Sequence, residues 1–248
     1  MGIVQLIDPF YTRLLDDTYL RTPVVGQICW LVSPHIDAIP RIMGVERIDP
    51  KEHYATKFEI RNMNPSTDFK IKDRLPIYKL NLRATEEILV QRAKKRPAII
   101  IATEFTIFDD VKEKLRSLDR KHLQQQGILV APLFSVDTPE DPGGFPPIMT
   151  ARIRSLMYRQ FFFCPRKGSP LVHDSVARLD RLHVVLHESS PGVRSPAYDP
   201  TQYALSKEAL GVIMAMVQSL FGAPESEELK AIRELAMEAL PPEAKKFV

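Results

Sequence analysis

This chain has very little cysteine and no long apolar run. Its 248 residues include only two cysteines, Cys29 and Cys164, too few for the disulfide frameworks of small secreted domains. Both lie in apolar segments, which predicts buried thiols, and the N-terminus lacks the basic and then apolar pattern of a signal peptide. We therefore expect a cytoplasmic protein. Because no apolar run approaches the roughly 20 residues that a bilayer-spanning helix needs, we expect no membrane partner.

The chain also lacks a strong net charge. Its 34 Lys and Arg residues exceed its 31 Asp and Glu residues by a formal charge of only +3. No field of the whole protein therefore argues for nucleic acid, and any such site must be a local patch. The hydrophobic fraction of 44% and the charged fraction of 26% are those of an ordinary globular protein with a sizeable core. We find no internal repeat and no low-complexity tract.

Short runs rich in β-branched and aromatic residues predict most of the secondary structure. Strands are predicted at 26–32, 42–48, 54–60, 97–103, 128–136 and 175–186. Residues 49–52, Asp-Pro-Lys-Glu, have turn chemistry, so the second and third strands should form a hairpin. Residues 137–147 hold four prolines and two glycines, which predicts a loop.

Apolar positions at helical spacing predict helices at 82–93, 109–126, 205–221 and 225–240. Asp109 or Asp110 can cap the second, Ser206 lies near the start of the third, and an acidic head suits the fourth. Residues 148–163 begin with a helical pattern and end in three phenylalanines that favour a strand, which leaves both open. Short strands broken by proline-rich loops, with late helices, fit a β-rich α+β fold, a small β-barrel with helical additions.

Five segments carry a resemblance to a known family. They are 26–32 (Gly-Gln-Ile-Cys-Trp-Leu-Val), 96–101 (Arg-Pro-Ala-Ile-Ile-Ile), 128–135 (Ile-Leu-Val-Ala-Pro-Leu-Phe-Ser), 174–182 (Asp-Ser-Val-Ala-Arg-Leu-Asp-Arg-Leu) and 205–210 (Leu-Ser-Lys-Glu-Ala-Leu). In this order they resemble the successive motifs of MazF/PemK-type toxins. Those are small SH3-like β-barrels that act as sequence-selective, metal-independent endoribonucleases, usually as homodimers held in check by an antitoxin.

The resemblance implies a divergent and elongated member of that family. It implies an N-terminal arm at 1–22, one elaborated SH3-like barrel domain at 23–222, and a C-terminal amphipathic helix at 223–248. Within the barrel domain, 36–90 with its hairpin and 105–126 with its helix are insertions. The implied partners are single-stranded RNA, a second copy of the chain, and an antitoxin or another protein, with neither cofactor nor metal.

Arg96 is the residue on which the implied chemistry depends. The family's catalytic arginine directly precedes the proline of its Arg-Pro strand, and by motif that arginine is Arg96. Cleavage of RNA through its own 2′-hydroxyl needs no metal, but it needs a cation that holds the phosphate and offsets charge in the transition state. The family's second catalytic position is a threonine, and here Phe134 occupies it. Ser135 supplies the adjacent hydroxyl, although a strand turns it to the opposite face unless a bulge re-aims it.

Two basic clusters are candidates for nucleic-acid binding. Arg92, Lys94 and Lys95 precede Arg96 at the mouth of its strand, where they could hold phosphates. A second cluster interleaves cations with aromatics and could form a stacking platform for single-stranded RNA; its members are Arg152, Arg154, Tyr158 and Arg159, followed by Phe161, Phe162 and Phe163. Solvated surface charges and core phenylalanines are the alternative interpretations.

Other assignments stay open at this point. His183 and His187 would lie about 13 Å apart on a strand, too far to share a zinc ion, whereas His173 or His183 could act as a general base. The acidic helix from Glu225 is either an ordinary packed helix or a built-in inhibitor over the basic patch. For the whole chain, the alternatives to a toxin-type RNA-binding protein with a degraded active site are a non-catalytic binding module on the same fold and an unrelated β-rich protein.

Overall fold

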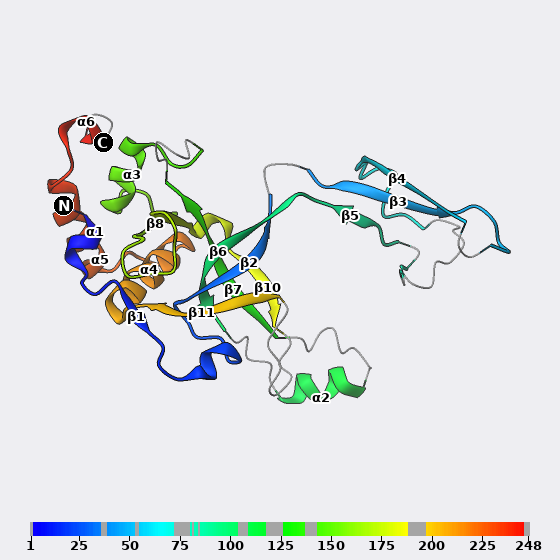
Figure 1. The fold of residues 1–248 in the computed structure, drawn as a ribbon, viewed down its shortest axis with the longest axis horizontal. Coiled ribbons are helices and arrows are strands. Elements are labelled where there is room, and N and C mark those ends of the chain that lie inside the picture. The colour runs from blue at the N-terminus through cyan, green and yellow to red at the C-terminus, as the bar shows by residue number, and fades with distance from the viewer. Residues whose placement is uncertain are drawn as a thin grey trace. The chain divides into compact units, whose positions relative to one another are not determined.

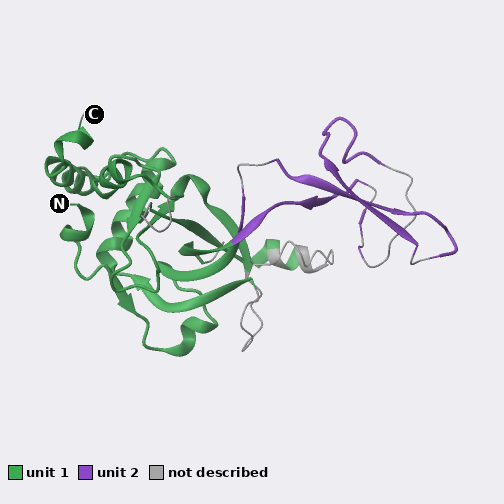
Figure 2. Ribbon diagram, turned by 45° about the horizontal axis from the view of Figure 1, so that its top comes forward, with its two compact units in different colours: residues 1–32, 95–248 green, residues 33–94 purple. Residues whose placement is uncertain are grey.

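The computed structural model describes residues 2–35, 39–52, 55–71, 80, 82–83, 85–103, 109–117, 126–136, 143–187 and 197–245 (Figure 1). Its contacts divide the chain into two units (Figure 2). We call residues 1–32 and 95–248 the main unit, and residues 33–94 the inserted unit, because the second interrupts the first along the chain.

The main unit is built on one large sheet. Its strands are β1 (Tyr11–Arg13), β2 (Gln27–Pro34), β6 (Ala93–Ala102), β7 (Gln126–Ser135), β8 (Phe161–Cys164), β9 (Ser175–Arg178), β10 (His183–His187) and β11 (Tyr198–Leu205). Their order is β1-β11-β2-β6-β7-β9-β8, and β10 also pairs with β7. The pairing is antiparallel along β6, β7, β9 and β8, and this confirms the predicted β-rich α+β class. Among the described strands, no pairing joins β1 to β8, so the sheet is not a closed barrel.

The main unit also contains helices. They are α1 (Ile3–Leu6), α2 (Asp109–Ser117), α3 (Pro147–Arg154), α4 (Lys207–Leu220), α5 (Glu227–Glu238) and α6 (Pro242–Lys245), with 3₁₀ turns η1 (Asp17–Leu20) and η4 (Leu179–Arg181). Helix α4 contacts β11 and α5, and α5 also contacts α1. Within the described part of the chain, none of these helices has the length and apolar character needed to span a membrane.

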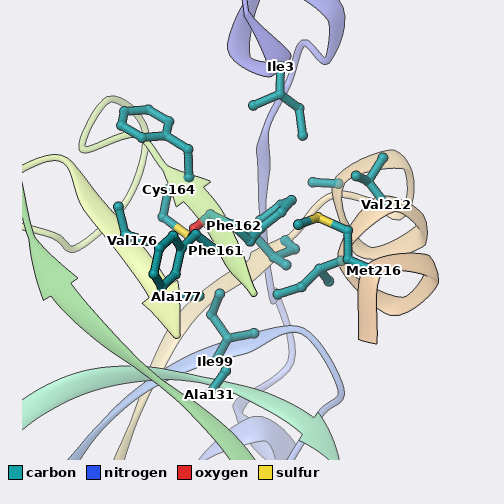
Figure 3. Packing of buried hydrophobic residues seen from close by; sticks show 14 of the residues in the cluster. Ile3, Ile99, Ala131, Phe161, Phe162, Cys164, Val176, Ala177, Val212 and Met216 are labelled. Carbon is teal, nitrogen blue, oxygen red and sulfur yellow. The ribbon is translucent and has the colours of Figure 1, made fainter. Parts of the chain in front are cut away.

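Both faces of β6 and β7 are buried, which explains their continuous apolar runs. On one face, Ile99 and Ala131 are cross-strand neighbours in the larger hydrophobic cluster, which Phe162 and Met216 of α4 join (Figure 3). On the other face, Ile100 is opposite Val130 in a smaller cluster. The remaining members of that smaller cluster are Cys29, Leu31, Ala98, Ile128 and Tyr198. The sheet is therefore the centre of the protein core.

Helix α4 begins at a buried N-cap. The Ser206 Oγ accepts a hydrogen bond of 3.3 Å from the Ala209 N–H, and Ser206 is only 5% exposed. We expect Ser206→Ala to lower the free energy of unfolding by about 1 kcal/mol, because it leaves that N–H without its acceptor. Urea unfolding measures this change. Ser226→Ala, which removes the equivalent cap from the more exposed start of α5, is the matched control and should cost less. Equal losses in the two variants would contradict the role given to burial at Ser206.

The inserted unit is a three-stranded antiparallel sheet in the order β4-β3-β5. Strands β3 (Arg41–Arg47) and β4 (Thr56–Asn62) pair from Arg41 opposite Asn62 to Arg47 opposite Thr56, which confirms the predicted hairpin. The buried Asp68 carboxylate accepts hydrogen bonds from the Arg61 guanidinium and, at 2.7 Å, from the Asn64 N–H. These bonds fix the segment that follows β4.

The helix predicted at 82–93 is wrong. Residues Ile88–Val90 form strand β5, which pairs with β3 through Ile42 opposite Leu89. The apolar residues of 82–93 do have helical spacing. However, β-branched residues favour strands, and the segment Ile88–Val90 forms backbone hydrogen bonds with the edge of β3. This tertiary pairing outweighs the local helical pattern.

Other boundaries also differ from the prediction. The helix predicted at 109–126 is shorter, because Gln126 already begins β7; residues 118–125 lie outside the described residues. Most of the predicted loop at 137–147 lies outside them too, and Pro147 begins α3. The ambiguous 148–163 segment contains both of its open alternatives, the helix α3 and the strand β8. Strand β11, which ends at Leu205, was not predicted at all.

Candidate nucleic-acid interface

Arg96 and Phe134 face each other across two neighbouring strands. Ala98 on β6 is opposite Pro132 on β7, and two residues further along in this antiparallel register Arg96 comes opposite Phe134. The guanidinium carbon of Arg96 lies 4.4 Å from the centroid of the Phe134 ring. Both side chains are half-buried. This is the geometry of a cation–π pair, in which the ring orients the guanidinium plane.

A second arginine, Arg178 at the end of β9, reaches the same ring. Its guanidinium carbon lies 5.9 Å from the centroid of Phe134 and 4.9 Å from that of Phe161 on β8. Phe161 is directly opposite Arg178 in the β8–β9 register. Two cations therefore share one aromatic ring on a surface to which β6, β7 and β9 contribute. We call Arg96, Phe134 and Arg178 the arginine–phenylalanine cluster.

Asp180 sets the charge of this cluster. Its carboxylate accepts two hydrogen bonds from Arg178, of 2.7 Å to Nε and 2.5 Å to Nη2, and Arg181 Nε lies 3.8 Å from it. Partial burial on its own would raise the pKa of Asp180, but the hydrogen bonds and charge of Arg178 hold that pKa below its usual range. Arg178 and Arg181 thus share this carboxylate, which offsets part of the positive charge beside Phe134.

Ser135 is not brought to this cluster. It is opposite Ser175 of β9, and it follows Phe134 directly on a strand, so its side chain projects from the other face. The register irregularity in β6 lies between Ile100 and Ala102, away from this position. No shift therefore turns Ser135 toward Arg96, and the catalytic arginine implied by the family has an aromatic ring, rather than a hydroxyl, beside it.

The other predicted basic residues are divided between the two units. Arg92 and Lys94 belong to the inserted unit, and Lys95 belongs to the main unit with Arg96. Lys95 forms a surface ion pair with Asp199 of β11. All three side chains are exposed. Lys95 is therefore held by an ion pair to β11, and the roles of Arg92 and Lys94 in nucleic-acid binding stay predictions.

The second predicted cluster is partly a structural assembly. The Nε of Arg152 donates a 2.9 Å hydrogen bond to the Ala244 carbonyl, and its Nη1 lies 3.4 Å from the Tyr158 hydroxyl. Arg154 lies 4.4 Å from the Phe163 ring centroid and forms a 2.9 Å ion pair with Asp174. Arg159 is exposed. Since these contacts join α3 to β8, α6 and the loop before β9, this cluster stabilises the fold.

The three consecutive phenylalanines are buried on both faces of β8. Phe161 is 7% exposed, and Phe162 and Phe163 are less exposed still. They therefore cannot form the open stacking platform proposed from their spacing, because a base needs an accessible ring face. Phe134, by contrast, is half-buried and has Arg96 and Arg178 beside its ring.

The histidines and cysteines are the remaining candidates. The Nδ1 of His183 lies 3.3 Å from the Arg181 carbonyl oxygen, and a general-base role for His173 or His183 stays a prediction. His183 and His187 lie on strand β10, as predicted, and the described residues contain no group of three or more His, Cys, Asp or Glu side chains that could hold a metal ion. Both cysteines are buried free thiols, as expected, and burial followed by the charge of Asp199 raises the pKa of Cys29 to about 12. Helix α5 packs through the buried Leu229 and Ala236.

Arg178 was missed at the sequence level as a site residue. It stands in the segment 174–182 that carries part of the family resemblance, but its neighbourhood to Arg96 depends on a β7 strand lying between β6 and β9. The residue types of the segments do not give this strand order; only the assembled sheet does.

No model of a protein family matches this chain, and no curated protein or solved structure is significantly similar to it.

Proposed function

We propose that this protein binds single-stranded RNA through the arginine–phenylalanine cluster, as a divergent MazF/PemK-like protein whose active site has lost its threonine. The observation that carries the proposal is the pairing of Arg96 with Phe134 at 4.4 Å, with Arg178 on the same ring. Guanidinium groups can grip phosphates, and a phenylalanine ring can stack on a base of any sequence.

The arrangement of the motif segments supports this proposal. Segments 26–32, 96–101, 128–135 and 174–182 include strands β2, β6, β7 and β9, which are consecutive neighbours in the sheet. The fifth segment, 205–210, begins at the end of β11, the strand on the other side of β2. The first four segments, which follow one another in the sequence, are thus adjacent in space, and the fifth lies beside the first.

The same geometry favours binding over cleavage. A ribonuclease that uses the 2′-hydroxyl must stabilise the transition state with a positioned cation and move protons through neighbouring polar groups. Here the Phe134 ring lies beside Arg96 where the family has a threonine, and Ser135 is on the other face. We therefore propose an RNA-binding protein in which Arg96 retains the phosphate-holding role without cleavage.

Binding of a fluorescent, unstructured RNA in EDTA tests this function. We expect Arg96→Ala to weaken binding about tenfold and to lower the salt dependence by about one phosphate contact, since one counterion-releasing cation is lost. Arg13→Ala is the matched control: Arg13 lies 5.4 Å from the Tyr203 ring centroid, on β1. Arg13→Ala also removes one positive charge and one cation–π pair, but from a strand that is separated from β6 by β11 and β2. It should leave the affinity unchanged.

Three other results have definite meanings. Equal weakening by Arg96→Ala and Arg13→Ala would show a diffuse charge effect and contradict the site. Cleavage in EDTA that Arg96→Ala abolishes would keep the site and overturn the loss of catalysis. Absence of both binding and cleavage at low salt would overturn the proposed function.

A further inference from the structure

Strand β4 is the edge strand of the inserted unit, and it has one apolar face and one charged face. In the order β4-β3-β5 it is the terminal strand, and within the described residues only its β3 side is paired. Thr56, Phe58 and Ile60 alternate with Lys57, Glu59 and Arg61. Phe58 is 62% exposed and Ile60 is 57% exposed. A terminal strand with apolar side chains in solvent is a template for pairing with another strand.

The charged face of β4 is complementary to itself. When two copies of a strand pair antiparallel about a two-fold axis perpendicular to the sheet, residues directly opposite each other belong to the same face. An axis at Phe58 places Phe58 opposite its own copy and Lys57 opposite Glu59 of the other chain, twice. It also places Thr56 opposite Ile60. In this register Lys57 and Glu59 meet opposite charges, Arg61 lies opposite Ala55, and Thr56, Phe58 and Ile60 meet the same face of the other copy.

Two neighbouring registers are less favourable. An axis at Glu59 would place two carboxylates directly opposite each other, which is destabilising. An axis at Ile60 would require Arg61 to pair with Glu59 of the other chain, but the Arg61 guanidinium is already held by the buried carboxylate of Asp68. By contrast, no ion pair joins Lys57 or Glu59 to another residue in the part of the chain that the structure describes. Within its own sheet Lys57 is opposite Glu46 of β3 and Glu59 is opposite Gly44, so the register centred on Phe58 adds a second carboxylate beside Lys57 and a cation beside Glu59.

We propose that the inserted unit is a self-association element, in which β4 pairs antiparallel with β4 of a second copy about Phe58. The two three-stranded sheets then join into one continuous sheet of two copies. Backbone hydrogen bonds along the strands supply affinity, and the Lys57–Glu59 pairs fix the register. A single strand pair buries less surface than a standard stable interface, so the dimer is a weak one that depends on protein concentration and on salt.

Charge exchange tests this pairing in the full-length protein. The dissociation constant is measured by sedimentation equilibrium at low salt for the natural chain, for Lys57→Glu and for Glu59→Lys. Each variant places like charges opposite each other twice, so we expect each to raise the dissociation constant at least about tenfold. An equimolar mixture of the two variants restores opposite charges at both positions and should dimerise as the natural chain does. Lys70→Glu, an exposed lysine of the same unit outside β4, is the control and should leave the dimer intact.

The outcomes separate this interface from others. Circular dichroism shows that the variants are folded, which their exposed positions predict. A natural chain that stays monomeric at millimolar concentration overturns the proposal and leaves the β4 edge to a strand of another protein. A dimer that both variants retain places the interface elsewhere. Two monomeric variants whose mixture does not dimerise overturn the register. RNA binding by the cluster on the main unit is measured separately, so neither result decides the other.

Discussion

Replacing Phe162 with alanine is expected to destabilise the main unit by about 3–5 kcal/mol, the largest effect that we foresee for a single side chain. Phe162 is fully buried, and its ring centroid lies 5.8 Å from that of Phe10 in the N-terminal segment. It is opposite Ala177 on β9, in the cluster that includes Met216 of α4 (Figure 3). Truncation removes contacts with three separate parts of the chain and leaves a cavity.

Urea unfolding followed by tryptophan fluorescence measures this effect. The single tryptophan of the chain, Trp30, lies in β2 of the main unit, so its signal reports on the unit that contains Phe162. Phe221→Ala is the matched control, because Phe221 is 73% exposed, and its cost should be within about 0.5 kcal/mol. Phe162→Leu keeps most of the volume and gives a folded variant of intermediate stability if the alanine variant does not fold. A cost below 1 kcal/mol for Phe162→Ala would contradict the assignment of the core.

Two strands that the sequence predicted well are buried on both faces. Residues 97–103 and 128–136 are continuous apolar runs, and they form β6 and β7 at the centre of the sheet. Strand β11 was missed because Tyr198–Leu205 contains Asp199, Pro200 and Gln202, which weaken a strand pattern. Its pairing with β2 shifts register between Pro200 and Ala204, and this irregularity accommodates the proline. Such a strand is defined by its neighbours and not by its own composition.

In the candidate site too, local sequence predicted some features, whereas others depend on which strands become neighbours. The alternation of side chains along a strand sufficed to predict that Ser135 would point away from the face of Phe134. The pairing of Arg96 with Phe134 followed from the family resemblance, which placed both at one site, and the strand register brings their side chains together. Arg178 joins them only because β7 separates β6 from β9, and strand order cannot be read from residue types. The phenylalanines of β8 were ambiguous for the opposite reason: their burial depends on α3 and its neighbours, not on their spacing.

The second large effect is expected at Gln27, whose side chain is completely buried in β2. Its Oε1 accepts a 3.1 Å hydrogen bond from the Val24 N–H, and its Nε2 donates to the Thr201 carbonyl at 2.9 Å and the Tyr19 carbonyl at 3.4 Å. One side chain thus joins η1, the turn before β2 and strand β11. Gln27→Leu keeps a similar volume but removes all three bonds, so we expect a loss of about 2–4 kcal/mol in the free energy of unfolding.

Gln218→Leu provides the matched control for that loss. Gln218 is exposed on α4, so the same chemical change there should alter stability by less than about 0.5 kcal/mol. The comparison isolates burial, because both variants replace an amide by an aliphatic side chain. If Gln27→Leu cost no more than Gln218→Leu, hydrophobic burial would offset the lost hydrogen bonds. The backbone pairing of β2 with β6 and β11 would then suffice to position β2 in the sheet. A cost in the expected range instead shows that Gln27 adds to the β1–β11 pairing in holding the N-terminal segment on the sheet that carries Arg96 and Phe134.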